Sequence, residues 1–145
     1  MLFRSRTFQS TNGPGTSFSG TGEGSWENGV WDYNVLPRPG AEEQLNASLG
    51  ASWSYDPASK TMVSYDTVAV AEIKADFIKQ GRLGGGMWWE SSGDRGGKAA
   101  NKADGSLIGT FVDRVGGVAA LDQSPNALEY PESKYDNLRA GFPGE

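Results

Sequence analysis

Acid–base chemistry in this 145-residue chain must come from Asp, Glu, Tyr or Lys, because the sequence contains neither Cys nor His. The same two absences exclude disulfides, thiol catalysis, serine–histidine triads and zinc sites built on Cys or His. No metal site and no cofactor are therefore expected. Three carboxylates stand near aromatic residues, and an enzyme acting through its own side chains would need a pair such as Glu27 with Glu90 or Asp94.

Residues 81–94, GRLGGGMWWESSGD, place three glycines before two adjacent tryptophans and a glutamate. The apolar run 83–89 predicts a buried strand. Side chains alternate along a strand, so Trp89 and Trp88 are expected to face opposite sides. The segment therefore offers either a binding surface or crowded aromatic packing.

The elements that would position these residues follow from local patterns. Residues 1–8 indicate a short strand, and 26–36 a strand or strand pair. The stretch 53–66 is typical of a β-hairpin. Apolar spacing predicts helices over 67–80 and 106–115, ended by Gly81 and by Gly116-Gly117. Residues 9–25 are rich in Gly, Ser and Thr and are consistent with a linker, and the tail from Leu121 is irregular. Helix, strand, long loop and helix together indicate an α/β fold.

The net charge and the hydropathy of the chain exclude two classes of partner. The net charge is −5, and no basic stripe is present to neutralise phosphates or to anchor on a membrane, so neither nucleic acid nor a membrane is expected. No apolar run approaches the roughly 18 residues of a membrane span. The first residues, MLFRSRTFQS, lack the apolar core of a signal peptide.

Five stretches carry a family resemblance: RTFQSTNGPG, GEGSWENGVWDYNVLP, TMVSYDT, GRLGGGMWWESSGD and ALEYPESKYDNLRAG. In this order, from Arg6 to about Gly144, they resemble the C-terminal part of a fungal-type family 18 glycoside hydrolase, a chitinase. The resemblance implies a fragment of a (β/α)8 TIM barrel that carries the α+β chitinase insertion domain, and hence an incomplete barrel. Residues 1–8 would be the remnant of barrel strand seven, 9–64 the insertion, and 65–145 the last helix–strand–helix unit with the tail.

Three positions match family positions that contact sugar. Trp89, at the end of strand eight, resembles the tryptophan on which the sugar stacks. Arg6 resembles an arginine near the end of strand seven, although the preceding residues depart from the family pattern. Glu27 resembles a carboxylate of the insertion domain that hydrogen-bonds substrate. The implied partner is chitin or a chito-oligosaccharide, and the family location is extracellular.

The family's catalytic acid ends an Asp-rich motif on strand four, and no D-x-x-D-x-D-x-E pattern occurs in this chain. Strands one to six are also missing. No catalytic residue is therefore assigned, and we expect a chitinase-derived chain that is inactive alone; the family itself uses substrate-assisted retention. Two alternatives remain open. One is a non-catalytic chitin-binding protein, and the other is an enzyme using its own carboxylates, about 5 Å apart if retaining. Open barrel-strand edges would favour self-association.

Overall fold

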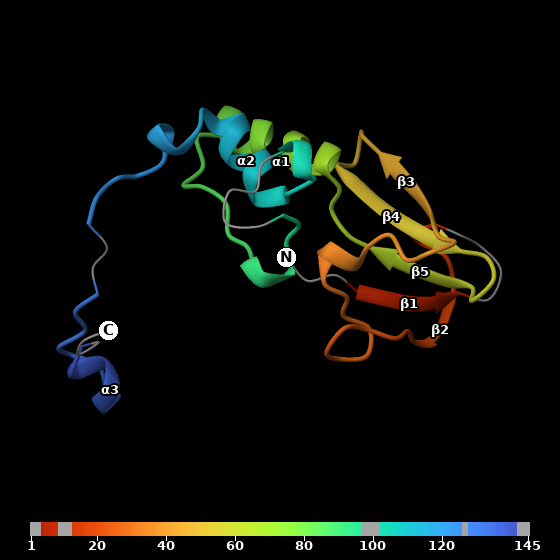
Figure 1. The fold of residues 1–145 in the computed structure, drawn as a ribbon, viewed down its shortest axis with the longest axis horizontal. Helices are drawn as coiled ribbons and strands as arrows, with labels where there is room; N and C mark the ends of the chain where they lie inside the picture. The colour runs from red at the N-terminus through yellow and green to blue at the C-terminus, as the bar shows by residue number, and fades with distance from the viewer. Residues whose placement is uncertain (1–3, 9–12, 97–101, 126–127, 142–145) are drawn as a thin grey trace.

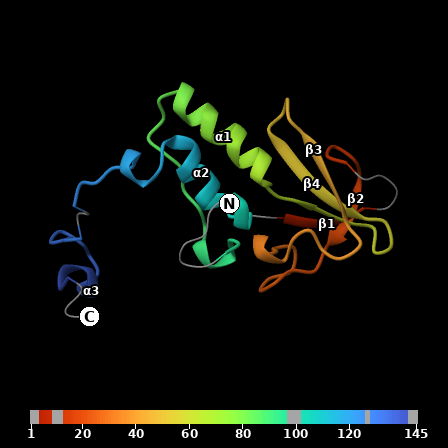
Figure 2. The ribbon, with the colours of Figure 1, turned by 45° about the horizontal axis from the view of Figure 1, so that its top comes forward.

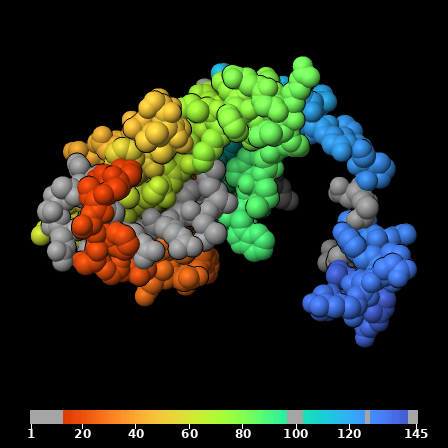
Figure 3. Space-filling view, turned by 180° about the vertical axis from the view of Figure 1, so that it is seen from behind, coloured from red at the N-terminus to blue at the C-terminus, as the bar shows by residue number. Residues whose placement is uncertain are grey.

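The computed structural model describes residues 4–8, 13–96, 102–125 and 128–141. A β-sheet lies beside a pair of helices (Figures 1 and 2). The C-terminal segment, residues 121–125 and 128–141, extends away from both. In the space-filling view of Figure 3 this C-terminal segment stands apart from the rest of the molecule. In the described ranges, no helix has the length and apolar character needed to span a membrane.

Among the residues that the structure describes, the sheet has five antiparallel strands in the order β2-β1-β5-β4-β3. Their bounds are Arg4–Phe8 for β1, Phe18–Thr21 for β2, Glu42–Asn46 for β3, Ala51–Asp56 for β4 and Thr61–Ser64 for β5. The short strand expected in 1–8 is confirmed as β1. It pairs with β5 and β2, so it lies in the same sheet as strands from the expected insertion 9–64. The assignment of these segments to a barrel and its insertion stays a prediction.

The hairpin predicted over 53–66 is confirmed as β4 and β5. Its turn is closed by Asp56, whose carboxylate accepts hydrogen bonds from the Ala58 amide at 2.9 Å and the Ser59 hydroxyl at 2.5 Å. Bonds from a backbone amide to the side chain, such as the one from Ala58, are the reason Asp is favoured in turns. Lys60 takes a positive φ of 54° before the chain enters β5.

Both predicted helices are confirmed, as α1 (Val68–Gln80) and α2 (Leu107–Val115). The Thr67 hydroxyl accepts from the amide of Val70 at the start of α1, and Ser106 caps α2 in the same way. Gly116 ends α2 with a φ of 119°, a conformation that costs glycine little. Across the helix pair, the Arg114 guanidinium binds the Asp76 carboxylate through two hydrogen bonds.

The core lies where the sheet, the helices and the loop after residue 31 meet. Its buried cluster contains Tyr33, Leu36, Val63, Tyr65, Ala71 and Leu107. Each of the three parts contributes at least one member, so burial of these side chains joins them into one body.

Two sequence interpretations are wrong in the first third of the chain. Residues 26–36 form neither a strand nor a strand pair; they contain one isolated bridge and a short 3-10 helix, Tyr33–Val35. Here the Asp32 carboxylate accepts from the Trp26 indole at 2.8 Å, and the Asp32 amide donates to Ser25 Oγ. These local bonds hold a turn where aromatic and β-branched content suggested a strand. The linker interpretation of 9–25 also fails, because β2 lies within it.

The buried strand expected at 83–89 is wrong as well. The segment forms no ladder with any described residue, and Leu83, Met87 and Trp89 are 52%, 74% and 73% exposed. An apolar run without periodicity predicts burial only where another element covers it. Among the described residues, α2 packs against Trp88 but leaves Leu83, Met87 and Trp89 exposed. In the described parts of the tail, residues 121–125 and 128–141, the chain is irregular as predicted, apart from the single turn α3 (Asp136–Arg139).

Candidate functional site

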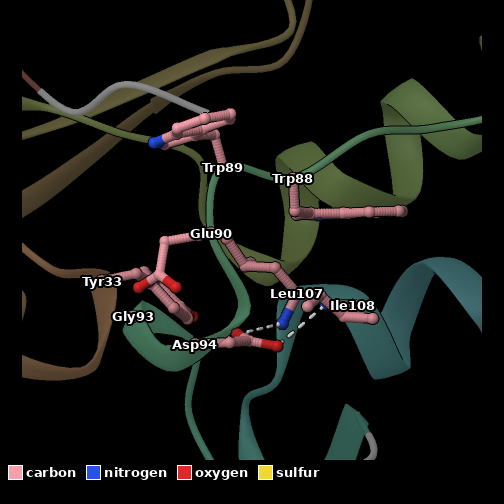
Figure 4. A pocket seen from close by; sticks show the side chains of 8 residues that line it. All are labelled: Tyr33, Trp88, Trp89, Glu90, Gly93, Asp94, Leu107 and Ile108. Atoms are coloured by element: carbon pink, nitrogen blue, oxygen red, sulfur yellow. Dashed lines mark hydrogen bonds between the residues drawn. The ribbon is translucent and has the colours of Figure 1, made fainter. Parts of the chain in front are cut away.

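A small pocket lies between the residue 88–94 segment and the start of α2 (Figure 4). Its lining residues are Tyr33, Trp88, Trp89, Glu90, Gly93, Asp94, Leu107 and Ile108. The cavity volume is about 20 Å³, which is room for about one water molecule. A larger ligand therefore does not fit inside this pocket.

The two adjacent tryptophans point in opposite directions (Figure 4). Trp88 packs its ring edge against Phe111 of α2, with centroids 4.8 Å apart and planes at 70°. Gly86 makes room for this contact, since a Cβ there would come within 2.8 Å of the Trp88 ring. Trp89 turns away from α2 and is 73% exposed. The anchored Trp88 thus holds its neighbour as an exposed aromatic surface.

Asp94 is a second cap of α2, beside Ser106, which the sequence analysis missed. Its carboxylate accepts from the Ser106 hydroxyl at 2.6 Å, the Leu107 amide at 2.9 Å and the Ile108 amide at 3.1 Å. A carboxylate at this position satisfies otherwise unpaired amides and interacts favourably with the helix dipole. Asp94 lies twelve residues before the Ser106 cap, beyond the reach of a local capping pattern. These three bonds favour a structural role over acid–base chemistry.

Of the three predicted contact residues, the structure describes the side chains of Trp89 and Glu27, and these two do not line the same pocket. Trp89 lines the pocket, whereas Glu27 is exposed in a separate turn whose bridge partner is Val30. Arg6 belongs to β1, where its Cα pairs with those of Met62 and Thr21. The side chain of Arg6 lies outside the described residues.

The other carboxylate in this segment, Glu90, accepts a hydrogen bond from the Ser92 hydroxyl. The peptide bond between Trp89 and Glu90 is cis. In the described ranges, no three acidic side chains gather closely enough to hold a metal ion.

Tyr33 forms the wall of the pocket on the side of the sheet. Burial raises the pKa of its phenol, while the nearby Arg95 guanidinium opposes that shift. The phenol donates to the Gly105 carbonyl at 2.9 Å, and Arg95 lies 4.5 Å from the ring centroid. Tyr33 therefore stays neutral and fixed, and its part is structural support for the segment that carries Trp89.

Comparison with known proteins identifies the family. Residues 1–94 match the model of glycosyl hydrolases family 18. The chain belongs to this family. It is 46% identical over 134 residues to Endochitinase 1 of Metarhizium robertsii, which covers 92% of this chain and 30% of that relative. Chitinase 1 of Aphanocladium album is 42% identical over 137 residues, covering 94% of this chain and 30% of the relative. The chain thus spans less than a third of the length of these relatives.

Solved chitinase structures show the same fold. The catalytic domain of psychrophilic chitinase B from Arthrobacter TAD20 matches with a TM-score of 0.65 and 32% identity, over 78% of this chain and 23% of that chain. A chitinase from Trichuris suis matches with a TM-score of 0.67 at 21% identity, over 79% of this chain and 34% of that chain, a likeness in fold alone. The resemblance to family 18 chitinases inferred from sequence motifs is confirmed.

Proposed function

We propose that this chain supplies a substrate-contacting part of a chitinase, and that the 145-residue chain by itself does not cleave chitin. The observation that carries the proposal is the exposed indole of Trp89, held beside a Trp88 that is packed against Phe111. In a chain of family 18, the substrate implied is a β-1,4-linked N-acetylglucosamine polymer. The relatives named as chitinases support this choice.

The chemistry of the site suits a sugar ring. A pyranose presents apolar C–H groups on its faces and hydroxyls at its rim, so it can cover an indole while its hydroxyls bond to water or polar groups. The pocket beneath Trp89 is too small for a sugar, so the ring would lie on the outer face of the indole. Glu27 and Arg6 are proposed as further contacts, accepting from and donating to substrate hydroxyl or carbonyl groups.

Cleavage would follow the family's substrate-assisted route, in which the substrate acetamide attacks the anomeric carbon and an enzyme acid protonates the leaving oxygen. We propose that this acid comes from the part of the family domain that the chain does not span. Asp94 is engaged in capping α2. Glu27 lies in a turn of its own and does not line the pocket that contains Glu90 and Asp94. A catalytic pair of Glu27 with Glu90 or Asp94 is therefore not proposed, and neither is a catalytic residue in this chain. An extracellular location stays a prediction.

Binding can be tested by calorimetric titration of the chain with a soluble chito-oligosaccharide. Covering one indole face, about 80 Å², contributes about 2 kcal/mol, so Trp89→Ala should weaken affinity by roughly 30-fold. The matched control is Tyr135→Ala, since Tyr135 is an aromatic residue 56% exposed on the C-terminal segment. Equal affinity of wild type and Trp89→Ala would contradict the proposed platform.

Catalysis needs a second experiment. The chain alone should release no reducing sugar from chitin. If reducing sugar is released, and is still released after Glu27→Gln and Glu90→Gln, the chain contains a catalytic group other than these two. A chimera of Metarhizium robertsii Endochitinase 1, with its matching segment replaced by this chain, should hydrolyse chitin. Trp89→Ala in the chimera should lower kcat/KM. A folded but inactive chimera would count against the proposal.

A further inference from the structure

Residues 32–36, named here the connecting segment, lie between the turn that carries Glu27 and the segment that carries Trp89. We propose that the connecting segment fixes the position of Glu27 relative to Trp89. The positioning residues are Asn34, which belongs to the connecting segment, and Arg95, which binds to it. Neither residue is proposed to touch substrate. The inference rests on the proposed function for its consequence in binding, but its structural content is independent of that function.

On the Trp89 side, two side chains join the connecting segment to residues 90–95. The Asn34 amide donates to the Ser92 carbonyl at 3.3 Å. The Arg95 guanidinium donates to the Leu36 carbonyl and covers the Tyr33 ring at 4.5 Å. A charged donor on a carbonyl is stronger than a neutral one, so Arg95 is the firmer of the two links.

The two segments also lie side by side at Gly93. A Cβ placed on Gly93 would lie 3.4 Å from the Asp32 carboxylate, which is ordinary van der Waals contact. Tyr33 and Leu36, at 3% and 2% exposure, fix the connecting segment in the core. The Tyr33 phenol also bonds to the Gly105 carbonyl just before α2. The connecting segment therefore has little freedom to shift.

On the Glu27 side, Asp32 holds the turn. Its carboxylate accepts from the Trp26 indole at 2.8 Å, and its amide donates to Ser25 Oγ at 3.0 Å. Within the turn the Val30 amide donates to the Glu27 carbonyl at 3.0 Å. Hydrogen bonds and contacts thus run without a break from the Glu27 turn, through the connecting segment, to the residues next to Trp89.

A fixed distance between Glu27 and Trp89 would determine which sugar units of an oligosaccharide the two residues contact. Two side chains that bind the same oligosaccharide contribute together only if the distance between them matches the spacing of the sugar units they contact. A small change in that distance weakens binding. Contacts among the connecting segment, residues 90–95 and the Glu27 turn would set this separation. Loosening Arg95 should leave Trp89 and Glu27 chemically intact but no longer held at one distance.

The separation can be measured directly, because the sequence contains no cysteine. Spin labels attached after Glu27→Cys and Met87→Cys report the distance between the turn and the segment before Trp89; Met87 is 74% exposed. We expect one narrow distance distribution, broadened or shifted by Arg95→Ala and, less strongly, by Asn34→Ala. The matched control is Arg139→Ala, since the contacts of Arg139 with Ser133 and Asp136 lie within the C-terminal segment. That control should leave the distribution unchanged.

Unlabelled protein with Glu27 intact gives the second readout. Arg95→Ala should weaken chito-oligosaccharide affinity by about tenfold, because binding would then have to restore the separation that Arg95 otherwise fixes. An unchanged distance distribution in both variants would overturn the proposal, as would a broadened distribution with unchanged affinity. Absence of binding by wild type would instead refute the proposed function, and the distance measurement would still decide the positioning role. If the Arg95→Ala protein does not fold, both measurements are made on Asn34→Ala instead. The Asn34 side chain is exposed, so its replacement should not unfold the protein.

Discussion

Replacing Asp94 with alanine removes the acceptor of three hydrogen bonds at the start of α2, two of them from backbone amides. Loss of a cap costs about 1 kcal/mol, and loss of a negative charge at a helix N-terminus up to about 1 kcal/mol more. The Ser106 hydroxyl, buried at 1% exposure, also loses its acceptor, which costs about 1–3 kcal/mol. Because these effects overlap, we expect a total of about 3 kcal/mol.

A chain of this size loses roughly 3 °C in Tm per kcal/mol, so Asp94→Ala should lower Tm by about 10 °C. Thermal unfolding followed by far-UV circular dichroism measures this change. Hydrogen exchange of the α2 amides should show the loss concentrated in the first turn.

The matched control is Asp113→Ala, at the other end of the same helix. Removing a negative charge near a helix C-terminus, and adding a residue of higher helix propensity, should leave Tm unchanged or raise it. Equal Tm values for the Asp94→Ala and Asp113→Ala proteins would refute the assignment of Asp94 as a second cap beside Ser106.

Three further predictions concern stability. The Arg114 guanidinium holds the pKa of Asp76 below its usual value. The stabilisation from this pair is therefore complete above about pH 4 and is lost as pH falls through the lowered pKa. In urea titrations at acid pH, the free energy of unfolding of Arg114→Ala should change less with pH than that of the wild type. Burial and the bond to Glu43 raise the pKa of Tyr65, so stability should fall as pH rises past about 10, where the unfolded phenol ionises first. Tyr65→Phe should reduce that fall without abolishing it, because the pKa of Tyr33 is also raised by burial. Thr67→Ala should cost about 0.5–1 kcal/mol by thermal unfolding, through loss of the α1 cap.

Local patterns were enough to predict the elements that depend on local interactions. The helices were predicted with nearly correct bounds, because Thr67 and Ser106 are adjacent caps and the apolar spacing is helical. The β4–β5 hairpin also followed from two β-rich runs around a turn. Strand β3, by contrast, has the sequence EEQLN and is mostly exposed. It is held by pairing with β4, and neither composition nor alternation indicates such a partner.

The candidate site was predicted in part. Trp88 and Trp89 do point apart, but in an irregular exposed segment rather than in the expected buried strand. Burial of an apolar run depends on what lies beside it, which is a property of the whole fold. The cap by Asp94 and the link by Arg95 join residues far apart in the sequence, so no spacing rule could find them.

The three consecutive glycines before the tryptophans differ in how much variation they should tolerate. Gly84 has open space where a side chain would go, so alanine or serine should be accepted there. Gly85 is limited by its backbone, with a φ of 139° that other residues rarely adopt. Gly86 is limited by its neighbours, since a side chain would collide with Trp88 and Phe111. A saturation library across these positions should therefore return many residues at the first and almost only glycine at the third, although the sequence shows the same letter three times.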